Sequence, residues 1–122
     1  MTIQERKVGD VTVLAIDGRI SASSPERLLA ATVRTLLQQD RNRILVNMQN
    51  VPYIDSTGLA EIVEAYHTTT RRGGALKLAH LTPHVRELLT VTMLLTVFEV
   101  FESEAAGLAS FGPGRREPQQ TS

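Results

Sequence analysis

The sequence predicts an α/β protein with a mixed sheet of about five strands and about four helices. Runs with strand periodicity alternate with longer runs of helical periodicity, an order that indicates parallel strands joined by right-handed crossovers. The first two strand-like runs, residues 3–6 and 11–16, are separated by a turn at Gly9 and Asp10, so they form an antiparallel hairpin at one edge. With 122 residues, of which 42% are hydrophobic, the chain has the size of one domain with its own core.

The first helix is predicted from its start signals and its apolar stripe. Either Ser23 or Ser24 can cap it, Pro25 suits its first turn, and Ser23 with Glu26 has the spacing of a capping box. Its inward-facing residues recur at helical spacing: Leu29, Val33, Leu36 and Leu37. We therefore expect this helix to bury one face.

A buried strand, a second helix and another strand follow in the middle of the chain. Residues 44–48 are apolar or β-favouring and suit a strand covered on both faces. The second helix begins near Asp55 and Ser56 and ends at residues 71–74, where basic residues precede two glycines. Its apolar stripe consists of Leu59, Ile62, Val63 and Tyr66. Residues 76–79 form the next predicted strand.

The last third of the chain predicts a helix, a strand and a short helix. Thr82 is expected to cap the third helix, and Pro83 is expected to occupy its first turn. Residues 97–101 are expected to form the last strand, and residues 104–111 the last helix. The residues of these two helices that we expect to face inward are Val85, Leu88 and Leu89, and then Ala105, Leu108 and Phe111.

Composition limits the domain organisation and the class of function. Residues 1–112 form one predicted domain, and the polar tail of residues 113–122 is expected to be disordered. Thirteen Lys and Arg balance thirteen Asp and Glu, which excludes the broad basic field that direct nucleic-acid binding requires. There is no cysteine for a disulfide or a thiolate metal site. Without an apolar run near 18 residues or a secretory signal, we expect a cytoplasmic protein with no membrane insertion.

Few residues suggest catalysis. The chain has no glycine-rich phosphate loop and no G-x-S-x-G nucleophile elbow. Pro83 and a strand-to-helix boundary separate His80 from His84, which disfavours a metal site. His67 lies about 16 Å along the second helix from Ser56, too far to activate its hydroxyl, whereas spacing leaves His84 open as the base of a serine hydrolase. On balance we expect no enzyme, no cofactor and no metal.

Residues 51–59 stand out because they place small and polar side chains where the second helix begins and backbone N–H groups lack partners. Asp55 or Ser56 can cap these groups, but capping needs only one of them, and Thr57 adds a second hydroxyl. Gly58 costs roughly 1 kcal/mol relative to alanine in a helix, which indicates that another backbone or a large group comes close. A phosphate on Ser56 would add about −1.5 to −2 charges, which the helix start tolerates and a docked partner surface does not.

The chain resembles STAS domains, specifically the stand-alone anti-sigma factor antagonists of bacteria, most clearly at residues 53–59 (YIDSTGL). Three further stretches support the resemblance: residues 17–20, 70–78 and 94–101. Together they cover the chain from about residue 3 to residue 111. The resemblance implies a STAS-like sheet in the same element order that the periodicity predicts.

By this resemblance, Ser56 is phosphorylated by a partner that is both an anti-sigma factor and an ATP-dependent serine kinase. The unphosphorylated protein would bind this kinase and free the sigma factor. Phosphorylation would expel it until a metal-dependent phosphatase of the PP2C type resets the switch. Asp55 would position the hydroxyl or shape the partner contact, and Thr57, Gly58 and Leu59 would complete the docking turn. Thr57 is the alternative position for the phosphate.

The loop of residues 18–24 is expected to lie beside this turn, because loops after parallel strands meet at one end of the sheet. It would form the second part of the partner interface. Arg19 and Ser21 stand at positions where many members of the family carry acidic residues, so this interface differs in charge. An alternative function keeps the same fold: an accessory STAS subunit of a larger sensory assembly or of a lipid-transport ATPase.

Overall fold

The computed structural model describes residues 1–21 and 27–112, so the predicted capping residues 23–26 and the predicted tail 113–122 lie outside the described residues. Within the described part, five strands form one sheet in the order β1-β2-β3-β4-β5. β1 (Thr2–Val8) pairs antiparallel with β2 (Val11–Asp17), and β3 (Arg43–Asn50), β4 (Ala75–Ala79) and β5 (Val100–Phe101) follow in parallel. The predicted mixed sheet with an antiparallel edge hairpin is confirmed.

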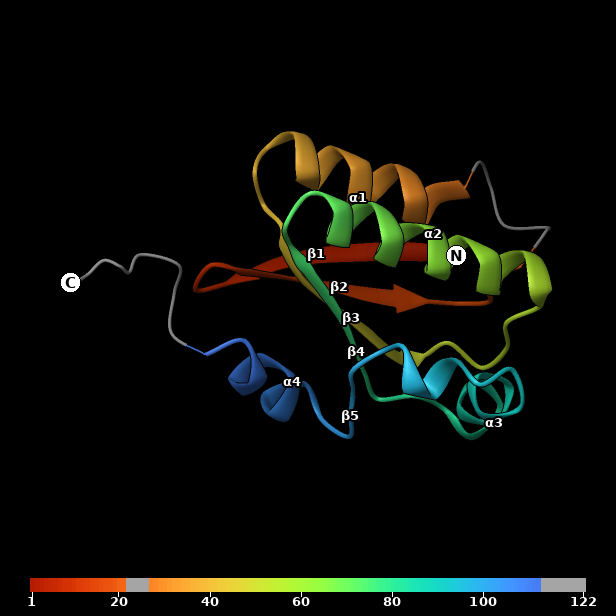
Figure 1. Cartoon of the computed structure of the whole chain (residues 1–122). Coiled ribbons are helices and arrows are strands. Elements are labelled where there is room, and N and C mark those ends of the chain that lie inside the picture. Colours follow the sequence, from red (N-terminus) through yellow and green to blue (C-terminus); the bar gives the residue numbers. More distant parts are fainter. Residues whose placement is uncertain (22–26, 113–122) are drawn as a thin grey trace.

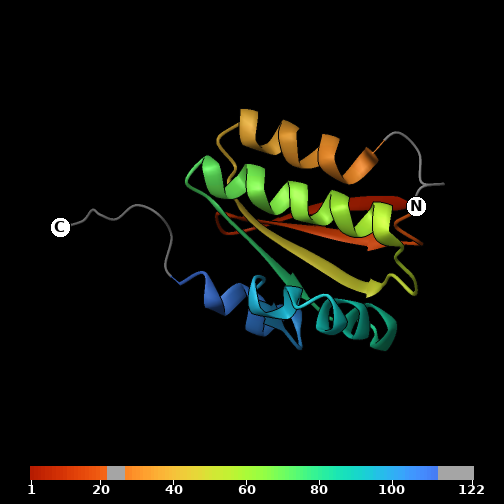
Figure 2. The same cartoon turned by 45° about the vertical axis from the view of Figure 1, so that its right-hand side comes forward.

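The helices cover the two faces of the sheet unequally. α1 (Leu28–Gln38) and α2 (Ser56–Arg71) lie side by side over one face, and the shorter α4 (Glu104–Ser110) lies over the other (Figures 1 and 2). α3 (Pro83–Val91) and the 3-10 helix η2 (Leu94–Thr96) connect β4 to β5 and pack against each other. The predicted alternation of strands and helices is therefore confirmed.

The main core lies between the sheet and the α1–α2 pair. The four predicted inward residues of α1 are all buried there: Leu29, Val33, Leu36 and Leu37. Val85 and Leu89 of α3 and the buried Phe98 belong to the same core. A second, smaller core lies beneath α4 and consists of Val11, Val13, Leu45, Ala79 and Phe111. The strands β2, β3 and β4 thus contribute apolar side chains to both faces, which the sequence predicted for residues 44–48.

α2 presents a more polar face to the core than its predicted stripe suggests. Ile62 is buried, whereas Leu59, Val63 and Tyr66 are only half-buried. The carboxylate of Glu61 is buried and accepts a 2.9 Å hydrogen bond from the backbone N–H of Ala30, in the first turn of α1. A negative charge is favourable at that position, because the first N–H groups of a helix lack intrahelical partners. Glu61 therefore links the two helices of this face.

Thr82 occupies the N-cap position of α3, as predicted, but its side chain does not cap the helix. Its hydroxyl donates a 2.7 Å hydrogen bond to the carbonyl oxygen of Val51, and α3 has no side-chain cap at this position. Pro83 does begin the helix, as predicted. The Thr82 hydroxyl thus ties the start of α3 to the segment between β3 and α2.

The strand expected over residues 97–101 is wrong in its first three residues. The N–H groups of Val97 and Phe98 both donate to the carbonyl oxygen of Leu94, at 3.0 and 3.1 Å, so the chain continues the turn that begins in η2. This turn buries Phe98, whose ring meets that of Tyr66 edge-on with 5.0 Å between the centroids. The β-favouring composition of this run is overridden by the burial of one aromatic ring.

α4 matches the predicted last helix closely, and Ser103 caps it by accepting a 3.0 Å hydrogen bond from the N–H of Ala106. The expectation that Ala105 faces inward is wrong, because Ala105 is exposed. Gly107 is the residue that faces the sheet, and a Cβ added there would lie 2.8 Å from Cδ1 of Leu45. The absence of a side chain at Gly107 lets α4 approach β3 closely.

Candidate functional site

The start of α2 is capped by Asp55. This residue has the extended backbone of an N-cap (φ −102°, ψ −176°), and its Oδ1 accepts a 2.9 Å hydrogen bond from the N–H of Gly58. Its backbone carbonyl accepts a 2.8 Å bond from the N–H of Leu59. Capping is therefore done by the residue before Ser56, and the side chain of Ser56 is not needed for it.

Ser56 and Thr57 occupy the first two positions of α2, and both are exposed. Within residues 1–21 and 27–112, neither hydroxyl makes a hydrogen bond to another group. The backbone N–H groups of these two residues belong to the first turn of the helix, where an anion is stabilised. The turn thus presents to solvent two hydroxyls that bond to no group in the described part of the chain.

Gly58 is required by a close approach between two segments. It is buried, and a Cβ added there would lie 2.6 Å from the carbonyl carbon of Ile20 and closer still to its oxygen. Both of these are backbone atoms, so the clash could not be relieved by a side-chain rotation. The close backbone approach predicted from the sequence is confirmed, and the backbone concerned is that of the loop after β2.

Backbone hydrogen bonds hold this loop against the turn that precedes α2. The N–H of Ile20 donates to the carbonyl oxygen of Tyr53 (3.2 Å), and the N–H of Asp55 donates to the carbonyl oxygen of Ile20 (3.3 Å). Ile20 and Ile54 form an isolated parallel bridge. The predicted neighbourhood of the two loops is confirmed for residues 18–21. Of the two residues singled out there, Arg19 is exposed and Ser21 is buried.

Side chains from two loops and from the first turn of α3 stack at this end of the molecule. The guanidinium of Arg19 lies over the ring of Tyr53, with Cζ 5.5 Å from the ring centroid. The ring of Tyr53 also stacks on that of His84, with 5.0 Å between centroids and 22° between planes. Tyr53 is 39% exposed despite these contacts. Sequence reasoning missed these contacts, because Arg19 and His84 lie 34 and 31 residues away from Tyr53 in the sequence. The one available signal was that Tyr53 is an aromatic residue in the motif of residues 53–59.

A largely apolar groove of about 520 Å³ begins at Ser56 and runs along the outer side of α2. Leu59, Ala60 and Val63 of α2 line it together with Leu94 of η2. At the far end it is bordered by polar residues, among them His67 and Arg71. The half-burial of Leu59 and Val63 is thus explained, because one side of each residue faces the core and the other faces this groove.

The described residues give the serine hydrolase alternative no support. α2 is one continuous helix, so its 1.5 Å rise per residue keeps His67 about 16 Å from Ser56. His84 stacks on Tyr53, and neither histidine hydrogen-bonds to Ser56 within the described ranges. The contact between nucleophile and base on which such catalysis depends is not formed.

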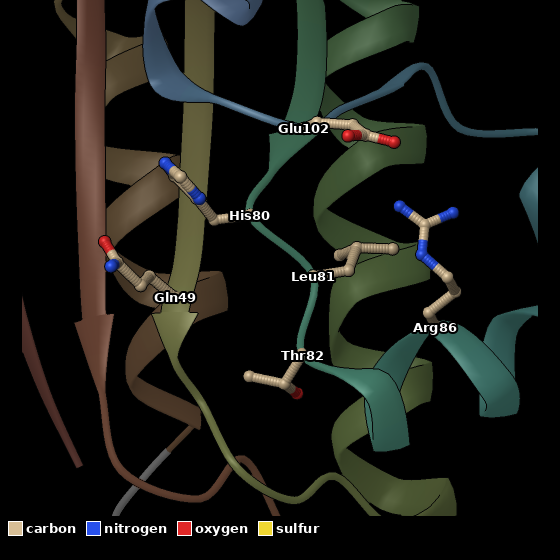
Figure 3. A pocket seen from close by; sticks show the side chains of 6 residues that line it. All are labelled: Gln49, His80, Leu81, Thr82, Arg86 and Glu102. Carbon is tan, nitrogen blue, oxygen red and sulfur yellow. The ribbon is translucent and has the colours of Figure 1, made fainter.

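His80 lies in a different place from His84. It lines a polar pocket of about 390 Å³ at the carboxyl ends of β3 and β4, which Figure 3 shows with His80 and Gln49 on one side and Arg86 and Glu102 on the other. The two histidines therefore do not converge on one site. In the part of the chain that the structure describes, no three His, Cys, Asp or Glu side chains are grouped as metal ligands.

The carboxylate of Glu104, the first residue of α4, has a shifted pKa. Partial burial alone would raise the pKa of Glu104, but hydrogen bonds from Asn47 and Arg6 and the charges of Arg6 and His80 lower it below its ordinary value of 4.5. The Asn47 amide donates to Oε1 at 3.0 Å, and Arg6 forms an ion pair with Oε2. Glu104 thus joins α4 to β1 and β3.

None of the helices formed by residues 1–21 and 27–112 has both the length and the apolar character needed to cross a membrane.

The fold and the turn at Ser56 match a known family. The family model described as "STAS domain" matches residues 2–107, which is most of the chain, so this protein belongs to the STAS domain family. The resemblance noted at residues 53–59 is thereby confirmed for the family as a whole.

Individual relatives are distant in sequence and close in fold. BtrV of Bordetella bronchiseptica, whose name marks it as a candidate anti-sigma factor antagonist, is 25% identical over 111 residues, which cover 91% of this chain and 95% of BtrV. The crystal structure of a candidate anti-sigma factor antagonist from Thermotoga maritima aligns with a TM-score of 0.82 and 21% identity, covering 88% of this chain and 92% of that one. Phosphorylated SpoIIAA from Bacillus aligns with a TM-score of 0.71 and 16% identity, covering 90% and 99% of the two chains. These structures share the fold of this protein.

Proposed function

We propose that this protein is an anti-sigma factor antagonist whose binding is switched by phosphorylation of Ser56. The observation that carries the proposal is the exposed hydroxyl of Ser56 at the start of α2, which capping by Asp55 leaves unused. Relatives support the class, because BtrV and a Paenibacillus polymyxa protein that is 19% identical over 98 residues carry names of anti-sigma antagonists. SpoIIAA, which shares the fold, has been solved both unphosphorylated and phosphorylated.

The physical basis of the switch is a difference in solvation. In the free protein, a phosphate on Ser56 is exposed to water and lies near the N–H groups of the first turn of α2, so its charge costs the fold little. In a complex that covers the turn, the same charge is removed from water beside the carboxylate of Asp55. We expect a loss of about 2–3 kcal/mol in binding, or roughly 30- to 150-fold.

The surrounding residues have distinct roles in this proposal. Asp55 holds the turn through Gly58, and Gly58 sets the distance to the loop that carries Arg19. Thr57 offers a second exposed hydroxyl, and Leu59 belongs to the groove that continues from Ser56 along α2. Ser21 belongs to the same loop and is buried, so we assign it to the support of the partner surface.

The partner in this proposal is an anti-sigma factor with serine kinase activity, and a PP2C-type phosphatase removes the phosphate. Kinase, ATP and sigma factor all act in the cytoplasm, where we therefore place the protein. The chain itself does no chemistry in this cycle. It supplies a surface that is complementary to the partner only while Ser56 is neutral.

Two measurements test the proposal. Mass spectrometry of the protein isolated from its own cells should find phosphate on Ser56; finding it on Thr57 would keep the mechanism and move the switch by one residue. The anti-sigma kinase should bind Ser56→Ala as tightly as the native protein and Ser56→Asp about 30-fold or more weakly. Equal affinity of the two Ser56 variants, with no phosphate in native material, would contradict the proposal.

The accessory-subunit alternative predicts a different result. Tagged protein would then copurify with a membrane ATPase or with a large particle containing several STAS domains, and its association would not change between Ser56→Ala and Ser56→Asp. The same pair of variants therefore separates the two functions.

A further inference from the structure

One face of α2 lines the groove that begins at Ser56 along the whole length of the helix. The lining residues of α2 recur at helical spacing, at positions 56, 59, 60, 63, 64, 67, 68 and 71, so they form a single stripe. From Ser56 to Arg71 the helix rises by about 22 Å, or roughly four turns. α2 lies between α1 and the α3–η2 segment (Figures 1 and 2), and the groove is on the η2 side, where Leu94 also lines it. The groove therefore has the length of a short helix.

The chemistry of the groove changes along its length. The half next to Ser56 is apolar and consists of Leu59, Ala60 and Val63. The far half is mostly polar and includes His67, Thr68 and Arg71. Glu64 also lines the groove, but its carboxylate forms an ion pair with Arg27. Arg71 has no ion-pair partner among the described residues, so the far half presents a cation.

The segment that carries Leu94 exposes further apolar side chains. Val91, Met93 and Val97 are 68%, 71% and 45% exposed, and all three lie within seven residues. Large apolar side chains that are grouped and open to water mark surfaces that bind another protein. Apolar surface is thus open on the α3–η2 segment as well as on α2.

The pattern of the groove disfavours an occupant from this protein itself. Residues 22–26 and 113–122, which lie outside the described part, contain no large apolar residue that would fill the apolar half. A second copy docked through its own α2 matches no better. An antiparallel pair of α2 helices would set the apolar half against the polar half, and a parallel pair would bring the two Arg71 side chains together.

We propose that the groove binds an amphipathic helix of the anti-sigma kinase, with apolar residues opposite the half next to Ser56 and an acidic residue opposite Arg71. The inference rests on the proposed function and adds the chemistry of the partner's contact. An amphipathic helix buries apolar side chains in such a groove at i, i+3, i+4 and i+7 spacing, and a carboxylate fits the paired N–H donors of a guanidinium. A phosphate on Ser56 lies at the apolar end of the groove, where its charge opposes the burial that holds the helix.

The experiment measures binding of the purified anti-sigma kinase to the unphosphorylated protein. Ala60→Glu places a charge in the apolar half, at a position where the free protein is exposed, and should weaken binding more than about tenfold. The matched control is Ala31→Glu, which makes the same change at an exposed position near the start of α1 and should bind like the native protein. Circular dichroism confirms that each variant is folded.

A second pair of variants tests the cationic end. Arg71→Glu should weaken binding about three- to tenfold, because it replaces an attraction to the partner's carboxylate by repulsion, and the loss should shrink as the salt concentration rises. Arg34→Glu, which makes the same charge change at an exposed position of α1, should bind within about twofold of the native protein.

The groove and the switch can fail separately. If Ala60→Glu binds as tightly as Ala31→Glu while Ser56→Asp still weakens binding, the groove lies outside the interface and the inference is wrong, although the switch stands. If Ala60→Glu weakens binding while Ser56→Ala and Ser56→Asp bind alike, the groove stands and the switch is wrong. Sedimentation that shows a dimer of the native protein and a monomer of Ala60→Glu would also overturn the inference, because the groove would then hold a second copy.

Discussion

The two faces of the sheet are held by different chemistry. Under α1 and α2, the sheet buries a large apolar core, and one buried carboxylate, Glu61, links the two helices. Under α4, the core has five buried residues among those that the structure describes, and the polar contacts of Glu104 with Arg6 and Asn47 add to the cover. Ser56 begins α2, so the proposed switch belongs to the densely packed face. The difference indicates that the first face determines global stability, whereas the second adds a smaller, charge-dependent contribution.

The largest expected effect comes from removing one leucine on each face. Leu36→Ala, at a position that is 1% exposed in the main core, should lower the free energy of unfolding by about 3 kcal/mol, because transfer energy and packing are both lost. Leu108→Ala on α4 is the matched change at a half-buried position, and we expect about 1 kcal/mol. Urea titrations of both variants measure the two values. Equal losses would show that the faces contribute alike.

A smaller effect compares two glycines at close approaches. In Gly58→Ala the new methyl group meets backbone atoms of Ile20, and we expect a loss of about 2 kcal/mol together with displacement of the loop that carries Arg19. In Gly107→Ala the methyl group meets the end of the Leu45 side chain, which can move, and the gain in helix propensity offsets part of the cost. The second loss should stay below about 1 kcal/mol.

Thermal unfolding with near-ultraviolet circular dichroism measures the stability of both glycine variants, and chemical shifts of residues 18–21 report the loop. A Gly58→Ala protein as stable as the native one, with unshifted loop signals, would contradict the close approach at Ile20.

The smallest expected effect is a pH dependence confined to the α4 face. Because the pKa of Glu104 is lowered in the folded protein, its ionised form stabilises the fold at pH values above its ordinary pKa of 4.5, and this contribution is lost as the pH falls through the folded pKa. Glu104→Gln should therefore be less stable than the native protein at pH 7, by under ~1 kcal/mol because Arg6 is half exposed. At pH 3 the difference should be smaller than at pH 7, because protonation of Glu104 removes the contribution.

Glu87→Gln on α3 is the matched control, because Glu87 is exposed and has no partner among the described residues. Its stability should follow that of the native protein at both pH values. A deficit of Glu104→Gln that persists unchanged at pH 3 would mean that packing, and not charge, is lost.

Most elements of the fold could be predicted because their signals are local. The α1 stripe, the cap at Asp55 and the proline at the start of α3 depend on neighbours within a few residues, and all three are present. The predictions failed for residues whose side chains interact with residues far away in the sequence and not with their neighbours. The Thr82 hydroxyl bonds to Val51, 31 residues away, and Phe98 leaves the expected strand to pack on Tyr66.

The candidate site was likewise predictable in its local features and not in its contacts between distant segments. The motif around Ser56 could be found from residue types and spacing, and Gly58 indicated that something comes close, without indicating what. That this neighbour is the Ile20 backbone, and that Arg19 and His84 both contact the ring of Tyr53, depends on how two loops and the start of α3 meet. Spacing along the chain carries no information on such contacts.

The sequence by itself determined the order of strands and helices, the family, and the hydroxyl that the proposed switch uses, because periodicity, capping and motif chemistry act over a few residues. Only the tertiary structure decided which backbone occupies the space beside Gly58 and which side chains contact the ring of Tyr53. Those properties arise when segments far apart in the chain pack together, and they are properties of the packed surface and not of any one segment.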